Sequence, residues 1–227
     1  TSSHADVVVV NGSHDFGTIA AFASADNLAA PLRVAIATGA TAGRHVQVRA
    51  DLACDGYVES HLWNLVVGQP SSLDQDDLEQ DLGWLTGVAG DTAVSGKWEI
   101  SDPQQTTSGA SIAQPADDHS PGGTRCAVTD GRAGTSAGTY DVDSGVTTLI
   151  SPQFDLEDAV SPLVSYWRWF TDLTQDDDEF VVDLSCDDGT TWTEVERVQS
   201  NDNAWRQVAF DPGLLLPLTD RMRLRFA

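Results

Sequence analysis

Short runs of β-branched and apolar residues, many alternating with polar ones, follow one another along the chain and are separated by Gly, Pro, Asn and Asp. Helical periodicity is nearly absent; only residues 73–82 fit a short helical turn. Short strands divided by turn residues are typical of an all-β sandwich or barrel rather than of β-α-β units. We expect strands at residues 7–10, 32–37, 45–52, 62–67, 145–150, 163–170, 180–185, 191–198, 205–210 and 221–226.

The pattern changes near residue 68. A Gly/Pro/Ser stretch follows there, and the Ala/Val-rich part before it holds one of the seven Trp. We therefore expect an all-β fold of two β-sandwich modules, at residues 1–68 and 75–227, joined by a linker at 69–74. A seven-strand sandwich takes about 100 residues, and the chain stops inside the strand-like segment 222–227. We expect a segment of a longer polypeptide, incomplete in its first module and lacking the last strand of its second.

The net charge of the chain limits the classes of partner that it can bind. The chain has 12 Lys and Arg against 35 Asp and Glu, which gives a formal net charge of −23. So negative a field repels phosphate backbones and anionic lipid, and we expect no nucleic-acid binding. No apolar run approaches the roughly 20 residues of a membrane-spanning helix, so we expect no membrane insertion. The hydrophobic fraction of 41% is enough to fill a core.

The three cysteines, Cys54, Cys126 and Cys186, are too far apart in sequence for a C-x-x-C metal or redox motif. Cys126 and Cys186 both lie in strand-like runs and are candidates for a disulfide. The alternative is three buried, inert thiols.

The second module resembles a jelly-roll domain of the MAM and cleaved-adhesin type, which is attached to secreted bacterial peptidases and other exoproteins. The resemblance lies in the order of short motifs over most of the module. They are Leu78-Glu79, Gly83-Trp84, Ser95-Gly96-Lys97-Trp98-Glu99, Asp102-Pro103, residues 113–120, 123–129 and 140–149, Ser151-Pro152, Phe154-Asp155-Leu156, residues 165–170, Asp187-Asp188-Gly189 and Thr191-Trp192. Cys186 departs from the pattern, since Asn is more usual there.

The first module resembles the later part of the immunoglobulin-like domain that often precedes this jelly roll. Its motifs are residues 16–19, 32–36, 42–46 and 62–68. The two resemblances imply a non-catalytic accessory or adhesion segment of an extracellular bacterial protein. Its partners would be other domains of the parent polypeptide, one of them a peptidase, and its task to space, stabilise or attach them.

Two acidic pairs are candidate calcium ligands: Asp117 with Asp118, and Asp141 with Asp143. Residues two apart on a strand face the same side, so Asp141 and Asp143 would converge on one ion. Calcium takes six to eight oxygen ligands in flexible geometry, and the resemblance to jelly rolls adds the expectation of a structural calcium ion. The alternative is that these carboxylates only solvate the surface or end turns. The run 176–179 fits a solvated loop better than an ion site.

Apart from the acidic residues, the aromatic run 166–170 is the most specific candidate for a binding site. On a strand Trp167 and Trp169 share one face, and Tyr166, Arg168 and Phe170 share the other. The two Trp side chains fit either sandwich core, which the apolar flank favours, or an exposed platform on which sugar rings stack. A carbohydrate-binding module is therefore an alternative function.

Catalytic motifs do not stand out. The five histidines show no H-E-x-x-H spacing, and Asp118-His119-Ser120 lacks a G-x-S-x-G elbow. We expect no enzyme in this segment. A further alternative is an extracellular assembly of neighbouring copies formed by strand exchange at the edges next to residues 7–10 and 221–226. In the second of these, Met222, Leu224 and Phe226 alternate with three arginines, which predicts one buried face.

Overall fold

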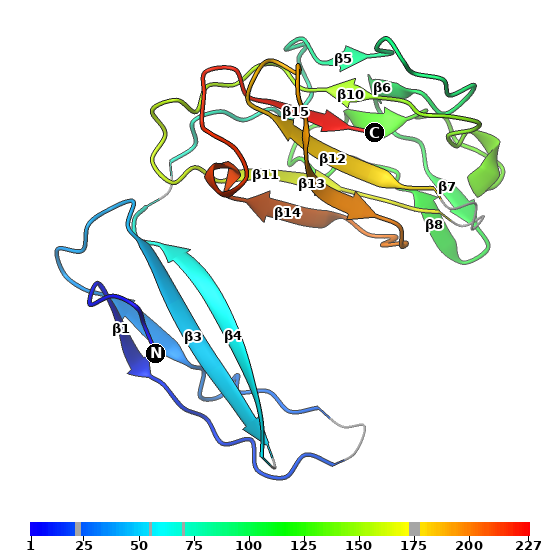
Figure 1. The fold of residues 1–227 in the computed structure, drawn as a ribbon. Coiled ribbons are helices and arrows are strands. Elements are labelled where there is room, and N and C mark those ends of the chain that lie inside the picture. The colour runs from blue at the N-terminus through cyan, green and yellow to red at the C-terminus, as the bar shows by residue number, and fades with distance from the viewer. Residues whose placement is uncertain (21–23, 55, 70, 173–177) are drawn as a thin grey trace. The chain divides into compact units, whose positions relative to one another are not determined.

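A computed structural model describes residues 1–20, 24–54, 56–69, 71–172 and 178–227. The fold is all-β, and the described residues contain no α-helix, only the short 3-10 turns η1 (Ala137–Thr139) and η2 (Pro212–Leu214). The chain forms two compact units, a first unit Thr1–Ser71 and a second unit Ser72–Ala227 (Figure 1). The division between them falls inside the 69–74 stretch.

The first unit consists of two antiparallel pairs. Strand β1 (Val7–Asn11) pairs with β2 (Arg33–Ile36), and β3 (His45–Cys54) forms a long hairpin with β4 (Tyr57–Val66). Its core is small, because among its described residues only Val7, Val46 and Val67 are buried hydrophobics. Strand β4 begins five residues before the expected 62, since the β3 ladder continues through every residue up to a turn at Gly56, whose φ is +85°.

The second unit is built on a five-stranded antiparallel sheet in the order β13-β12-β15-β10-β5. The strands are β5 (Leu85–Thr86), β10 (Leu149–Ile150), β12 (Phe180–Ser185), β13 (Thr193–Val198) and β15 (Arg223–Phe226). One face of this sheet carries the main core, whose buried members are Leu149, Leu156, Val182, Leu184, Met222, Leu224 and Phe226.

Three strand pairs make up the rest of the second unit (Figure 1). They are β11 (Val164–Arg168) with β14 (Arg206–Phe210), β6 (Trp98–Ser101) with β9 (Cys126–Thr129), and β7 (Thr106–Ser108) with β8 (Ser111–Gln114). Tyr166 of β11 meets Phe226 of the five-stranded sheet at a centroid distance of 5.3 Å, and Trp98 of β6 meets Phe180 at 6.4 Å. Aromatic side chains from both sets of strands thus share one core, as in a β-sandwich.

The C-terminal strand differs from the expectation. β15 lies in the middle of the five-stranded sheet, paired with β12 on one side and β10 on the other. An open edge at 221–226 was therefore a wrong prediction, and strand exchange there has no support. The alternation was correct, because Met222, Leu224 and Phe226 are buried. The arginines between them pair within the same unit, Arg223 with Asp188 and Arg225 with Asp183.

Other local features of the sequence were left open or were only partly correct. Residues 73–82 form no helical turn, and of the expected strand at 145–150 only Leu149–Ile150 pairs. Cys126 and Cys186 are not bonded, since all three cysteines are free. Burial raises the pKa of the Cys126 thiol to about 12, and the charges of Asp118 and Asp102 add to the effect. This thiol therefore stays protonated and unreactive at neutral pH.

Candidate binding surface and polar sites

The four carboxylates predicted to hold calcium are not gathered into one site. The described residues contain no group of three or more His, Cys, Asp or Glu side chains placed to hold a metal ion. The main chain of Asp143 forms an isolated antiparallel β-bridge with Ser95, and its carboxylate accepts a 3.0 Å hydrogen bond from the Ser95 hydroxyl. The Asp118 carboxylate accepts a 2.9 Å hydrogen bond from the Ser120 N–H. Asp141 and Asp143 do not share a regular strand. The geometric reason for pairing them was therefore wrong, and bound calcium stays a prediction.

The acidic run at 176–179 is described only in part. Asp176 and Asp177 lie outside the described residues. Glu179 forms an ion pair with Arg197 and accepts a hydrogen bond from Gln199. Its charge is thus neutralised within the unit by a neighbouring strand.

Trp167 of β11 and Trp169, which follows the end of that strand at Arg168, lie on the face away from the main core. Tyr166, on the core face, packs against Phe226 and donates a 2.7 Å hydrogen bond to Glu196, and burial raises its pKa. Trp167 is 43% exposed, and Trp169 meets Trp205 edge to face at 5.9 Å. Neither Trp167 nor Trp169 packs against the main core cluster. The predicted division of faces is correct. The core interpretation is wrong for Trp167, whereas Trp169 is half-buried, outside the main core cluster.

A residue distant in sequence completes this surface. The ring of His119 stacks on Trp167 with centroids 3.6 Å apart and planes 17° from parallel, and it meets Trp205 at 5.8 Å. We call His119, Trp167, Trp169 and Trp205 the outer aromatic cluster. The local sequence does not predict that His119 and Trp205 belong to this cluster. The pairing of β11 with β14 and the course of the 115–122 loop bring their rings close to Trp167 and Trp169.

Hydrogen bonds fix the base of the outer aromatic cluster. The indole N–H of Trp169 donates to the Ala113 carbonyl and to the Thr171 hydroxyl, both at 3.0 Å. The Asn203 amide donates to the Ile112 carbonyl at 3.0 Å. Gln207 lies directly opposite Trp167 in the β11–β14 register, and its residue is exposed. The exposed amide of Gln207 therefore lies beside the exposed indole of Trp167 on two paired strands.

The loop that carries His119 is anchored on its C-terminal side. The Glu79 carboxylate accepts the main-chain N–H groups of Thr124 and Arg125, each at 2.7 Å, and these hydrogen bonds lower its pKa. Thus Glu79, one of the motif residues, has a structural task.

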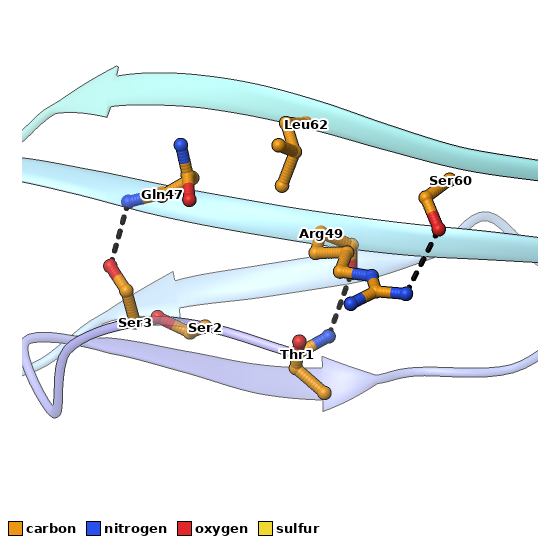
Figure 2. Close-up of a pocket in the computed structure, with 7 residues that line it drawn as sticks. All are labelled: Thr1, Ser2, Ser3, Gln47, Arg49, Ser60 and Leu62. Atoms are coloured by element: carbon orange, nitrogen blue, oxygen red, sulfur yellow. Dashed lines mark hydrogen bonds between the residues drawn. The ribbon is translucent and has the colours of Figure 1, made fainter.

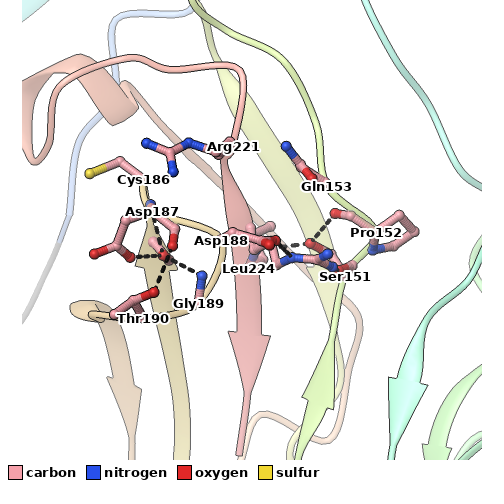
Figure 3. A network of polar contacts seen from close by, with 12 residues as sticks. Ser151, Pro152, Gln153, Cys186, Asp187, Asp188, Gly189, Thr190, Arg221 and Leu224 are labelled. Carbon is pink, nitrogen blue, oxygen red and sulfur yellow. Dashed lines mark hydrogen bonds and ion pairs between the residues drawn. The ribbon is translucent and has the colours of Figure 1, made fainter.

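A second polar network surrounds the turn after β12 (Figure 3). Asp187 accepts hydrogen bonds from the Thr191 N–H, the Thr191 hydroxyl and the Ser185 hydroxyl, which lower its pKa to about 2. Arg223 donates to the Ser151 carbonyl, and the Ser151 hydroxyl accepts the Leu224 N–H. The motifs Asp187-Asp188-Gly189 and Ser151-Pro152 therefore hold a turn and tie strands together.

The first unit contains an open pocket of about 430 Å³ between its N-terminal residues and the β3–β4 hairpin (Figure 2). Arg49, its charged residue, pairs with Asp51 at 2.7 Å and donates to the Ser60 hydroxyl at 2.9 Å. The lining residues are Thr1, Ser2, Ser3, Gln47, Arg49, Ser60 and Leu62. Because its cation is already paired, we assign this pocket no ligand.

Comparisons with protein families, curated proteins and solved structures all returned no match. Within the described ranges, no helix has the length and apolar character needed to cross a membrane.

Proposed function

We propose that this chain is a non-catalytic accessory segment of an extracellular multidomain protein, and that it attaches a functional domain to carbohydrate. The observation that carries the proposal is the outer aromatic cluster, in which Trp167 is 43% exposed on a strand whose other face packs into the core. The arrangement of motifs in the sequence supports the accessory and extracellular parts, including a peptidase as the attached domain.

The chemistry of this surface suits a sugar ring. An aromatic face packs against the C–H face of a hexose, and amide groups at its border hydrogen-bond with hydroxyls. Trp167 supplies the face and Gln207, opposite it, supplies an amide. The net charge of −23 opposes anionic polymers such as polyuronates. The expected ligand class is therefore neutral polysaccharide.

A retention assay tests this function. The chain fused to a fluorescent reporter is mixed with insoluble cellulose, chitin and xylan, and the fraction in the pellet is measured. We expect retention on at least one polymer and its loss in Trp167→Ala. Trp63→Ala, which removes a Trp that is 50% exposed in the first unit, is the matched control and should be retained. Equal retention of the two variants, or none for the unaltered chain, would rule out the proposed surface.

A further inference from the structure

We propose that His119 is a lid on the sugar-binding face of Trp167, and that a neutral hexose ring occupies this face only after His119 has moved away. This inference rests on the proposed function and adds a means of controlling it. It starts from one distance: the imidazole and indole centroids are 3.6 Å apart, with planes 17° from parallel.

At this separation the two rings are in van der Waals contact, since carbon atoms pack best about 3.5–4.0 Å apart. No second ring fits between them. The 43% exposure of Trp167 therefore belongs to the part of the indole that the imidazole leaves uncovered. A ligand that stacks on the indole face covered by His119 must take the place of the imidazole.

The lid and the base of the cluster are held differently. Trp167 and the main chain of β11 belong to a five-residue ladder with β14, and two hydrogen bonds fix the neighbouring Trp169. His119 lies in the 115–122 loop and is exposed. Within the described part of the chain its imidazole nitrogens make no hydrogen bond, and its ring contacts are those with Trp167 and Trp205. Displacing His119 therefore breaks ring contacts and no polar bond of its side chain.

The loop can supply this movement without loss of its anchor. Glu79 holds the main chain at Thr124 and Arg125, beyond the lid. Between the lid and this anchor lie Gly122, whose φ is +87°, and Gly123. Glycine tolerates a wide range of backbone angles, so these positions can absorb a rotation that lifts His119 from Trp167, at the cost of the 3.4 Å hydrogen bond from the Gly123 N–H to the Ser120 carbonyl.

The change in sugar affinity on removal of the His119 ring can be predicted. A stacked aromatic pair contributes about 0.5–1.5 kcal/mol, and tenfold in affinity corresponds to about 1.4 kcal/mol. Ligand binding must overcome this contact, so removing the imidazole should tighten binding by about 2- to 10-fold. A larger ring at the same position should weaken it.

The experiment is isothermal titration of the full chain with cellohexaose and, separately, chitohexaose, two neutral β-1,4-linked probes. We compare the unaltered chain with His119→Ala, His119→Trp and Trp167→Ala. The matched control is His61→Ala, because His61 also stacks on a Trp, Trp63, in the first unit. We expect tighter binding for His119→Ala, weaker for His119→Trp, none for Trp167→Ala and no change for His61→Ala. Melting temperatures verify that each variant is folded.

The experiment distinguishes failure of the lid from failure of the sugar-binding function. If the unaltered chain binds and Trp167→Ala does not, but His119→Ala binds equally or more weakly, the lid is wrong and the sugar-binding function stands. If neither the unaltered chain nor His119→Ala binds either probe, the sugar-binding function and the lid are both overturned.

Discussion

The carboxylate of a single residue, Asp187, holds the turn of the β12–β13 hairpin. Its two oxygens accept from the Thr191 N–H, the Thr191 hydroxyl and the Ser185 hydroxyl, and Ser185 itself is fully buried. These donors favour the ionised form, which is why the pKa falls from 3.8 to about 2. The next residues, Asp188 and Gly189, have φ values of +60° and +83°, the left-handed conformations that a tight Asp-Gly turn requires.

Asp187→Asn tests this contribution. A carboxylate whose folded pKa is lowered stabilises the fold above its unfolded pKa of about 4, and this stabilisation is lost as pH falls through the folded value near 2. We expect the variant to melt below the unaltered chain at pH 7, and the difference to shrink between pH 4 and pH 2. Circular dichroism melts across this range measure it, with Asp155→Asn, at a carboxylate that accepts one Glu157 N–H bond, as control. A difference that does not change with pH would contradict the argument.

Individual residues also mark the limit of sequence reasoning. The alternation of Met222, Leu224 and Phe226 was enough to predict their buried face. Their neighbours in the sheet were not predictable, because strand order depends on pairings between residues far apart in sequence. His119 was likewise considered only for catalysis, although its ring contact with Trp167 spans 48 residues of chain.

At the scale of elements, the apolar strands were predictable and the polar ones were not. Residues 180–185 were expected and form β12, because this run is rich in Val, Phe and Leu. Strands β7 and β8 consist of TTS and SIAQ, which carry little periodic signal. Pairing with each other defines them, as it does β6 with β9. The same limit applies to residues 141–143, where two acids were placed on a strand that does not form.

Gly96 is a position at which two segments approach closely. A Cβ built there would lie 2.3 Å from the carbonyl carbon and oxygen of Asp141, and its φ is +59°. Gly109 has a similar φ of +62° with no atom within 4 Å of a built Cβ. We expect Gly109→Ala to cost about 1–2 kcal/mol for its backbone conformation, and Gly96→Ala about 2 kcal/mol more because the main chain must also shift. Urea unfolding of both variants measures the difference, and equal costs would contradict the close approach.

Net charge acts at the scale of the whole molecule. With −23 formal charges, self-repulsion opposes the compact state, and a bound divalent cation would relieve it. If a specific calcium site exists, calcium at a hundred times its Kd should stabilise the fold by about 2.7 kcal/mol. The measurement is a thermal melt with calcium, with magnesium at equal ionic strength, and after EDTA. Equal shifts with the two ions, or none with either, would contradict the prediction of specifically bound calcium.

The two units differ in how much apolar surface they bury. Among the described residues, the core cluster of the first unit has three buried hydrophobic members and that of the second has seven, and each cluster draws its members from one unit alone. Many large side chains of the first unit remain exposed, among them Leu28, Tyr57 and Trp63. Since stability rises with buried apolar area, the first unit should unfold at a lower temperature than the second.

Scanning calorimetry of the full chain tests this difference. We expect two transitions, the lower for the first unit. Val46→Ala should lower only the first by about 5–15 °C, and Leu184→Ala should lower only the second by a similar amount, because each removes buried methyl groups from one core. Leu28→Ala, at an 82% exposed position, should leave both transitions in place. A single transition that both core variants shift together would show that the two units unfold as one cooperative body.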